Sequence, residues 1–249
     1  MNRATISDGC GCFPTGHHYA GIAHLLRTAV RGLVAGILGD SAWRGLKIAL
    51  IDVETTGRDP SLDRVIELGI AIGQDGEIIA RHNWLINPGR TIPAEAQAVH
   101  GISDAHVADA PRFEVVAAEI CAAIEGCVPG AYNAPFDRAF VTNEIARAGA
   151  SGVSVSSTSL ARDVEWFDPL VWAREIQREE KSKALGETAA RLGIQNETAH
   201  RASSDAETAL RVLYAFSSDG RMPQTYATMV QEQRRLAQAQ ADARRRWRS

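Results

Sequence analysis

The sequence predicts an α/β protein built on a mixed sheet. Strand patterns over 48–51, 65–72 and 77–86 follow one another closely, with the turn signal Asp75-Gly76 before the third. They predict an antiparallel start to the sheet. After them, segments with helical spacing alternate with short apolar runs, which favours a sheet that also contains parallel strands. With 249 residues, 45% apolar and 23% charged, the composition is typical of one large globular domain with appendages.

Ahead of the sheet, residues 20–38 carry the most regular helical pattern in the chain. Apolar residues recur there at i, i+3 and i+4, with His24, Arg27 and Arg31 outside the stripe. The pattern predicts an amphipathic helix that ends at Gly39-Asp40 and is buried against the body or a partner.

The three strands differ in pattern. Ile48-Ala49-Leu50-Ile51 is a continuous apolar run, which is consistent with a strand buried on both faces. Residues 65–72 are also strand-like, and residues 77–86 alternate well enough to form the third strand.

Helical spacing dominates the second half of the chain. A short strand is expected over 128–132, and residues 152–158 form either a loop or the fifth strand. The last helix has little apolar content, so we expect it to be partly exposed. The expected helices cover 111–125, 136–148, 169–177, 184–192, 201–217 and 225–246.

The four cysteines do not form a disulfide framework. Cys121 and Cys127 lie on or near one apolar segment and are interpreted as buried thiols. Cys10-Gly-Cys12 with His17-His18 could ligate a soft metal, but the spacing matches no closed zinc site. No apolar run approaches the roughly 18 residues of a membrane span, and residues 1–21 lack an export signal, so a cytoplasmic location is expected.

Charge is distributed unevenly along the chain. The net charge is −3, with +5 from residues 221–249 and +2 from residues 1–45, which leaves −10 for the centre. An acidic centre repels nucleic acid unless cations neutralise part of it, whereas a basic tail attracts it. The alternative is that the tail arginines only solubilise a helix.

The first of three acidic segments is Asp52-Val53-Glu54-Thr55-Thr56-Gly57, at the end of the first strand. On an extended chain Asp52 and Glu54 point to the same face. Two adjacent carboxylates repel each other unless a cation lies between them, which favours a bound divalent metal.

The other two segments are less specific when taken alone. Asp137 begins a helix, where a carboxylate can simply complement the helix dipole. His200 lies five residues before Asp205, so we expect His200 on the loop or first turn that leads into a helix carrying Asp205. Together the carboxylates are the hard oxygen ligands that Mg²⁺ or Mn²⁺ prefers, and two such ions beside a histidine base can cut a phosphodiester.

These motifs resemble those of the DEDDh family of 3′→5′ exonucleases, which includes the proofreading subunit of bacterial DNA polymerase III and ribonuclease T. Residues 52–57 are similar to the first motif, Asn133-Ala134-Pro135-Phe136-Asp137 to the second, and His200 to Asp205 to the third. Intervening segments such as Val99-His100-Gly101-Ile102 also match, and the resemblance covers about 47–216.

The resemblance implies a ribonuclease-H-like α/β fold with a five-stranded mixed sheet flanked by helices. It implies that Asp52, Glu54, Asp137 and Asp205 hold two Mg²⁺ or Mn²⁺ ions and that His200 takes the proton from the attacking water. The product would be a nucleoside 5′-monophosphate released from the 3′ end of single-stranded or frayed DNA, in proofreading or repair.

Further roles follow from the same resemblance. Glu67 is interpreted as a partner of Arg64 at a strand surface rather than as a carboxylate that supports the site. The residues expected to contact the terminal nucleotide are Thr55, Thr56, Gly57, His100, Asn133 and Phe136.

The expected organisation has three parts. Residues 1–46 form an N-terminal extension with the amphipathic helix, 47–217 the exonuclease domain, and 218–249 a basic helical tail. The expected partners are single-stranded DNA 3′ ends, with a polymerase subunit, a sliding clamp or a second copy of the chain as candidates and no membrane. Residues 224–229 faintly resemble a clamp-binding peptide. An exoribonuclease that trims RNA is the alternative within the same chemistry, and a non-catalytic nucleic-acid-binding or polymerase-docking module is the alternative of another class.

Overall fold

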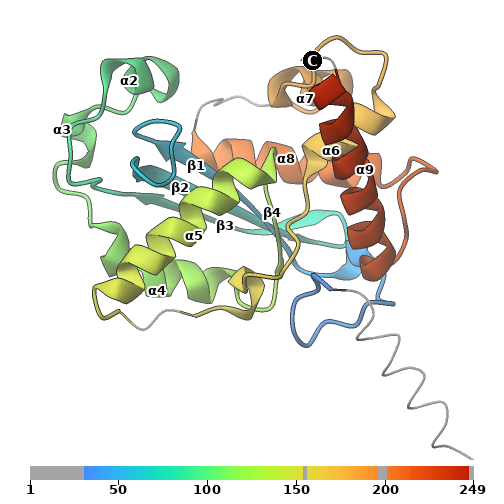
Figure 1. The fold of residues 1–249 in the computed structure, drawn as a ribbon, viewed down its shortest axis with the longest axis horizontal. Helices are drawn as coiled ribbons and strands as arrows, with labels where there is room; N and C mark the ends of the chain where they lie inside the picture. The colour runs from blue at the N-terminus through green and yellow to red at the C-terminus, as the bar shows by residue number, and fades with distance from the viewer. Residues whose placement is uncertain (1–30, 154–155, 196–200, 247–249) are drawn as a thin grey trace, which may run out of the picture.

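A mixed sheet flanked by helices forms the centre of the fold (Figure 1). The computed structural model describes residues 31–153, 156–195 and 201–246. Within them the sheet has the order β3-β2-β1-β4. β1 pairs antiparallel with β2, β2 antiparallel with β3, and β1 parallel with β4, which confirms the predicted antiparallel start and mixed sheet. The strands are β1 (Ile48–Thr55), β2 (Val65–Gln74), β3 (Glu77–Leu85) and β4 (Val128–Gly130).

Helices cover both faces of the sheet. On one face lie α4 (Phe113–Ile124) and α5 (Ala134–Ala150), and on the other α6 (Pro169–Ile176), α8 (Ala202–Phe216) and α9 (Tyr226–Arg246). The remaining helices are short: η1 (Trp43–Gly45), α2 (Ala94–His100), α3 (Asp104–Val107), η2 (Thr158–Leu160) and α7 (Leu185–Arg191).

The period-two alternation of β1 divides the apolar core into two layers. Ile48 and Leu50 pack with α8 and α9, whereas Ala49, Ile51 and Val53 pack with α4 and α5. Continuing the alternation beyond Leu50 sends the side chains at 52 and 54 toward the α8 face. The sequence therefore determines which helix these carboxylates can meet.

The described sheet has four strands, so the expectation of five is corrected. The described part of the candidate segment 152–158 forms no strand: it begins in a turn and ends where the 3₁₀ helix Thr158–Leu160 starts. The fifth position is reduced to a single parallel bridge between Gly130 and Phe167. At this bridge the N–H of Phe167 donates to the carbonyl of Pro129 at 2.8 Å, and the N–H of Ala131 donates to the carbonyl of Phe167 at 2.9 Å. The ladder does not extend because Pro169 starts α6 two residues later.

Residues 31–40 contain turns where the sequence predicted the end of a helix over 20–38. Gly32 and Gly36 adopt φ of 103° and 86°, which an α-helix does not contain. Val34 is nevertheless buried, and its N–H donates to the hydroxyl of Tyr226 at 3.0 Å. Residues 20–30 of the predicted helix lie outside the described residues.

α9 packs along one side against the core, and its opposite side is exposed, as expected. Its buried face carries Tyr226, Met229, Val230 and Leu236. Two of these belong to the segment that resembles a clamp-binding peptide, so that segment does not present its apolar side chains at the surface.

The described thiols match the sequence interpretation. Cys121 and Cys127 are free and buried. Cys10, Cys12, His17 and His18 precede the described residues. No helix in the described part of the chain is both long and apolar enough to span a bilayer.

Candidate active site

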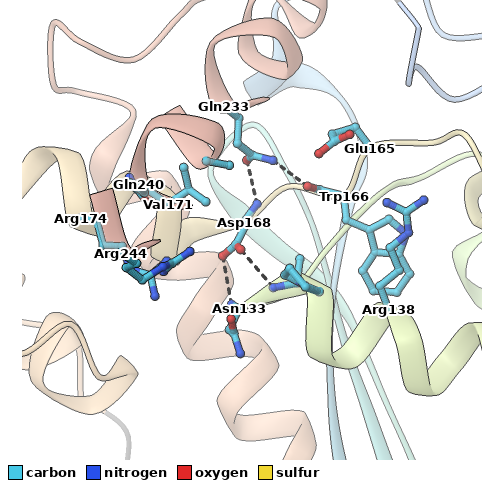
Figure 2. Close-up of a pocket in the computed structure, with 13 residues that line it drawn as sticks. Asn133, Arg138, Glu165, Trp166, Asp168, Val171, Arg174, Gln233, Gln240 and Arg244 are labelled. Carbon is cyan, nitrogen blue, oxygen red and sulfur yellow. Dashed lines mark hydrogen bonds between the residues drawn. The ribbon is translucent and has the colours of Figure 1, made fainter. Parts of the chain in front are cut away.

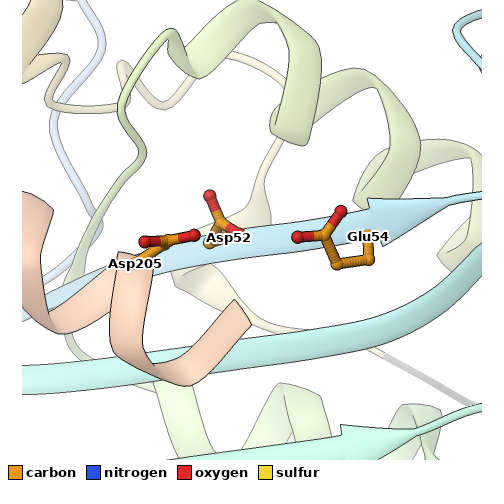
Figure 3. A group of neighbouring side chains, drawn as sticks. All are labelled: Asp52, Glu54 and Asp205. Carbon is orange, nitrogen blue, oxygen red and sulfur yellow. The ribbon is translucent and has the colours of Figure 1, made fainter. Parts of the chain in front are cut away.

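Three carboxylates from two elements meet at the end of β1 (Figure 3). Asp52 and Glu54 come from β1, and Asp205 comes from the first turn of α8. One ligand oxygen from each of the three lies within 4.8 Å of the others. All three side chains are partly exposed, so the cluster opens to solvent. Three hard oxygen donors at this separation fit a divalent cation.

Gly69 allows α8 to approach the sheet closely enough to form this cluster. It lies in the interior of β2, opposite Asp52 in the strand register. A Cβ atom at this position would lie 2.1 Å from the backbone N of Ser203 and 2.2 Å from the carbonyl carbon of Ala202. Any other residue would therefore push the start of α8, and Asp205 with it, away from β1. A glycine inside a strand is the sequence signal for such an approach.

Glu67 fixes the same helix start through an ion pair and hydrogen bonds. Its side chain is fully buried and forms an ion pair of 2.7 Å with Arg201, which directly precedes α8. It also accepts hydrogen bonds from the side chain of Asn83 and the N–H of Ala202. The interpretation of Glu67 as the partner of Arg64 at a strand surface is therefore wrong. Arg64 pairs with Glu144 on α5 at 2.6 Å.

Burial and mutual repulsion raise the pKa values of two carboxylates in the cluster. Burial, followed by the charges of Asp137, Asp205 and Glu54, raises the pKa of Asp52 well above its usual range. Burial, then Asp205 and Glu67, raises the pKa of Glu54 to about 7. Without a cation these carboxylates cannot all ionise at neutral pH, so the donor set favours a bound divalent metal.

Asp137 reaches the site from the opposite face of the sheet, through the first turn of α5. It is buried, and its Oδ1 accepts a hydrogen bond of 3.1 Å from the N–H of Val53. That N–H is available because β4 pairs with β1 only as far as Leu50. Asp137 is not part of the cluster of three, but its charge raises the pKa of Asp52 and it lines the same cavity.

A cavity of about 390 Å³ lies directly over the carboxylates. Besides Asp52, Glu54, Asp137 and Asp205 it is lined by Val99, Tyr132, Asn133, Phe136 and residues at the start of α7. Val99 is 61% exposed. Phe136 is half-buried and packs on Phe140 with ring centroids 4.9 Å apart, so one ring serves both the core and the cavity wall. The volume is within the range of small-molecule sites.

The segment after Glu54 is tied to its own loop. The hydroxyl of Thr55 donates to the carbonyl of Gly57 at 2.6 Å, and that of Thr56 donates to Asp63 at 3.1 Å. A Cβ at Gly57 would lie 2.3 Å from the carboxylate of Asp63. The glycine therefore makes room for an internal partner, a role that the spacing of the motif did not suggest.

The structure describes only one of the two histidines predicted to belong to the site. His200 lies outside the described residues. His100 ends α2 and is buried; its Nδ1 accepts a hydrogen bond of 3.0 Å from the N–H of Ile102. Its Nε2 makes no well-aligned hydrogen bond to the described residues, although the backbone of Thr55 lies near enough to favour the charged form of the ring. Burial lowers the pKa of His100, which keeps the ring neutral at pH 7.

The backbone turn at Asn133, which leads into α5 and Asp137, is held by a buried carboxylate. Asn133, immediately before α5, adopts a left-handed conformation with φ of 74°. Its N–H and that of Ala134 donate to the buried carboxylate of Asp168 at 3.0 and 3.1 Å. No motif or spacing in the chain singles out Asp168, whose contacts hold the turn that leads to Asp137.

The chain is similar to exonucleases in sequence. Residues 49–213 match the family model described as "RNase_T: Exonuclease". The chain is 32% identical over 194 residues to the "3'-5' exonuclease DinG" of Bacillus subtilis and 28% identical over 196 residues to a PolC-type DNA polymerase III of Thermotoga petrophila. The matches cover 77% and 79% of this chain but only 20% and 14% of those relatives. The chain therefore corresponds to a fraction of these larger proteins.

Solved structures share the fold. An Escherichia coli exonuclease I in complex with a dT13 oligonucleotide superposes with a TM-score of 0.60 at 19% identity, covering 70% of this chain and 41% of that one. Exonuclease X in complex with 5′-overhanging duplex DNA gives a TM-score of 0.54 at 25% identity, covering 74% and 99% respectively.

Proposed function

This chain belongs to the RNase_T exonuclease family, and we propose that it removes nucleoside 5′-monophosphates one at a time from the 3′ end of DNA. The observation that carries the proposal is the meeting of Asp52, Glu54 and Asp205 within 4.8 Å beneath an open cavity. A phosphodiester is anionic, and a cluster of carboxylates would repel it unless cations are bound between them.

The proposed cofactors are two Mg²⁺ or Mn²⁺ ions, held by Asp52, Glu54 and Asp205, with Asp137 as the fourth ligand. Bound divalent cations supply activation of a water and stabilisation of the charge that develops on the leaving oxygen. The fit rests on the chemistry of the donors, since each carboxylate that raises the pKa of Asp52 would be stabilised by a neighbouring cation.

Three residues outside the carboxylate set have proposed roles around the scissile bond. His200 accepts the proton of the attacking water, as a neutral imidazole can at working pH. His100 and the ring of Phe136 hold the terminal nucleotide, the first by donating a hydrogen bond from Nε2 and the second by contact with the base. Asn133 lines the same cavity and completes the proposed substrate contacts together with Thr55, Thr56 and Gly57.

We propose DNA as the substrate because two of the similar proteins are associated with DNA. The PolC-type relative is a DNA polymerase, and exonuclease X at 25% identity was solved with DNA. On the same grounds we propose a role in proofreading or repair, with a polymerase subunit as a candidate partner. A preference for RNA would depend on contacts to the 2′-hydroxyl.

The test is cleavage of end-labelled substrates by the purified chain. Single-stranded DNA, a 3′-tailed duplex and RNA of the same sequence are incubated with Mg²⁺, Mn²⁺ or EDTA. We expect a ladder that shortens from the 3′ end of DNA with either metal, nucleoside 5′-monophosphates as products and no cleavage in EDTA.

The other outcomes separate the alternatives. Faster shortening of RNA than of DNA would replace DNA by RNA as the substrate. Cleavage from the 5′ end would contradict the direction. Binding of DNA without cleavage of any substrate in either metal would indicate a non-catalytic module.

A further inference from the structure

A second cavity (Figure 2) shares the lining residue Asn133 with the cavity over the carboxylates. It has a volume of about 310 Å³ and lies between the start of α5, α6 and the C-terminal half of α9. Asn133 lines both cavities, so a single turn of backbone separates them. Since α9 begins after residue 213, one wall comes from a segment outside the family match.

Two arginines without an ion-pair partner among the described residues line one side of this cavity, and the charge of Asp168 acts on Arg174 only from beyond ion-pair distance. Arg174 of α6 and Arg244 of α9 lie side by side in Figure 2. Neither forms an ion pair or donates a hydrogen bond to any of the described residues. Burial, and then the charge of Arg244, lowers the pKa of Arg174. Two guanidinium groups held together in this way favour an anion between them.

The two carboxylates that line the same cavity are bonded to other partners. Asp168 is buried and accepts hydrogen bonds from the N–H groups of Asn133, Ala134 and Leu170. Glu165 pairs with Arg234 at 2.8 Å. Neither carboxylate lies within ion-pair distance of the two free arginines. The cavity therefore presents unpaired positive charge beside an acidic catalytic cleft.

We propose that Arg174 and Arg244 bind a backbone phosphate of the substrate strand, upstream of the scissile bond. The inference rests on the proposed function and goes beyond it, because it gives α9 a part in substrate binding. A guanidinium presents several N–H donors in a fixed plane that matches the oxygens of a phosphate. The strand would pass the turn at Asn133 between the two cavities, with its 3′ end over Asp52.

The first test uses charge-removing substitutions in the full-length chain. Arg174→Gln and Arg244→Gln are each expected to raise KM for single-stranded DNA about fivefold, the upper end for one partly exposed ion pair. The effect falls on KM because the cavity does not include the carboxylates of the cluster. Arg235→Gln is the matched control on α9. It removes the same charge, but Arg235 pairs with Glu232 and does not line the cavity.

The second test locates the phosphate. Oligonucleotides that carry one uncharged methylphosphonate linkage at successive positions from the 3′ end are degraded by the wild type and by Arg244→Gln. We expect one or two interior positions at which the neutral linkage raises KM for the wild type but has little further effect on the variant. Each lost phosphate contact should also reduce the slope of log KM against log salt by about 0.7.

The outcomes separate this inference from the proposed function. If the wild type cleaves no substrate, the proposed function fails and the inference with it. If the wild type cleaves DNA but Arg174→Gln, Arg244→Gln and Arg235→Gln behave alike, only the inference is wrong. Inhibition by inorganic phosphate or free dTMP that the two cavity variants relieve, without a methylphosphonate effect, would assign the cavity to a free anion and overturn the assignment to the strand.

Discussion

At the level of single residues, the spacing of the first motif explains two of the three carboxylates in the metal cluster. Two carboxylates two positions apart on a strand must share a face, so Asp52 and Glu54 follow from the sequence alone. Asp205 joins them because the alternation of β1 directs them to the side covered by α8. The roles of Asp205 and His200 can then be tested separately, since one is a proposed ligand and the other a proposed base.

We expect Asp205→Asn and His200→Ala each to lower kcat by about 10²- to 10⁴-fold, the range for a positioned acid or base. Only Asp205→Asn should also reduce the rise in melting temperature that Mn²⁺ produces, because only Asp205 lies in the carboxylate cluster. Thermal unfolding with and without Mn²⁺ measures the second effect. Near-normal turnover of His200→Ala would remove it as the base, and an undiminished Mn²⁺ shift in Asp205→Asn would remove that carboxylate as a ligand.

The ion pair between Glu67 and Arg201 predicts an asymmetric response to substitution. The side chain of Glu67 is fully buried, whereas that of Arg201 is 56% exposed. Arg201→Met would leave a buried carboxylate without its cation and is expected to lower the free energy of unfolding by about 2 kcal/mol. Glu67→Gln leaves the arginine facing water and should cost less than half as much. Urea denaturation compares the two, and equal losses would contradict this account of the pair.

The sequence did not reveal residues whose roles depend only on contacts with distant parts of the chain. The predicted exonuclease family is confirmed by the match over residues 49–213, because linked acidic motifs are specific even when each is weak. The roles of Gly69 and Asp168 were not predicted. Gly69 contacts Ser203, 134 positions later in the chain, and Asp168 accepts a hydrogen bond from Asn133, 35 positions earlier. Local patterns contain no information about such contacts. His200 and the other proposed site roles stay predictions.

At the level of elements, the sequence predicted most helices and strands but not how the sheet ends. The strands at 48–55, 65–74 and 77–85 follow from apolar periodicity and the Asp75-Gly76 turn. The fifth strand shrinks to one bridge at Phe167, which no periodicity could indicate. Helical spacing over 31–38 was misleading because Gly32 and Gly36 adopt positive φ there, and periodicity does not register that preference.

Gln233 of α9 bonds to backbone groups beside Phe167, where a full fifth strand would have made ladder hydrogen bonds. Its Oε1 accepts from the N–H of Asp168 at 2.8 Å, and its Nε2 donates to the carbonyl of Trp166 at 2.8 Å. We expect Gln233→Ala to lower the free energy of unfolding by about 2–3 kcal/mol, because two buried backbone groups lose their partners. Gln231→Ala, on the exposed side of the same helix, is the matched control for urea denaturation. Similar midpoints for both variants would show that α9 does not complete the sheet edge.

At the level of the whole molecule, an acidic catalytic centre is combined with a basic C-terminal helix. The sequence separates these charges as −10 over the centre and +5 over residues 221–249. The fold brings the two together, because the last turns of α9 reach the cavity beside Asn133. The described part of this basic segment, 221–246, therefore belongs to the folded body, since Tyr226, Met229 and Leu236 are buried in the core. The domain boundaries predicted at 47 and 217 stay a prediction.

Burial of the carboxylates and the repulsion among them should also make the stability of the whole metal-free protein depend on pH. Folding raises the pKa of Glu54 from 4.5 to about 7, so the folded state holds more protons than the unfolded state between these values. The free energy of unfolding therefore falls as pH rises through this window. In EDTA we expect the melting temperature to drop by roughly 3–6 °C between about pH 5 and pH 7.5, and saturating Mn²⁺ should suppress most of the drop.

The titration of two other groups must be considered when the melting curve is interpreted. Asp219, whose pKa its partner Arg221 lowers to about 2, affects stability only at pH values well below the window. His100 acts in the opposite sense within the window, because burial lowers its pKa and the unfolded chain then binds more protons. Glu54→Gln isolates the contribution of Glu54, since it removes that titration and leaves those of Asp52, Asp137 and His100 in place. The variant in EDTA should lose less melting temperature across the window than the wild type. Parallel curves for the two proteins would show that repulsion at the cluster is not what the metal relieves.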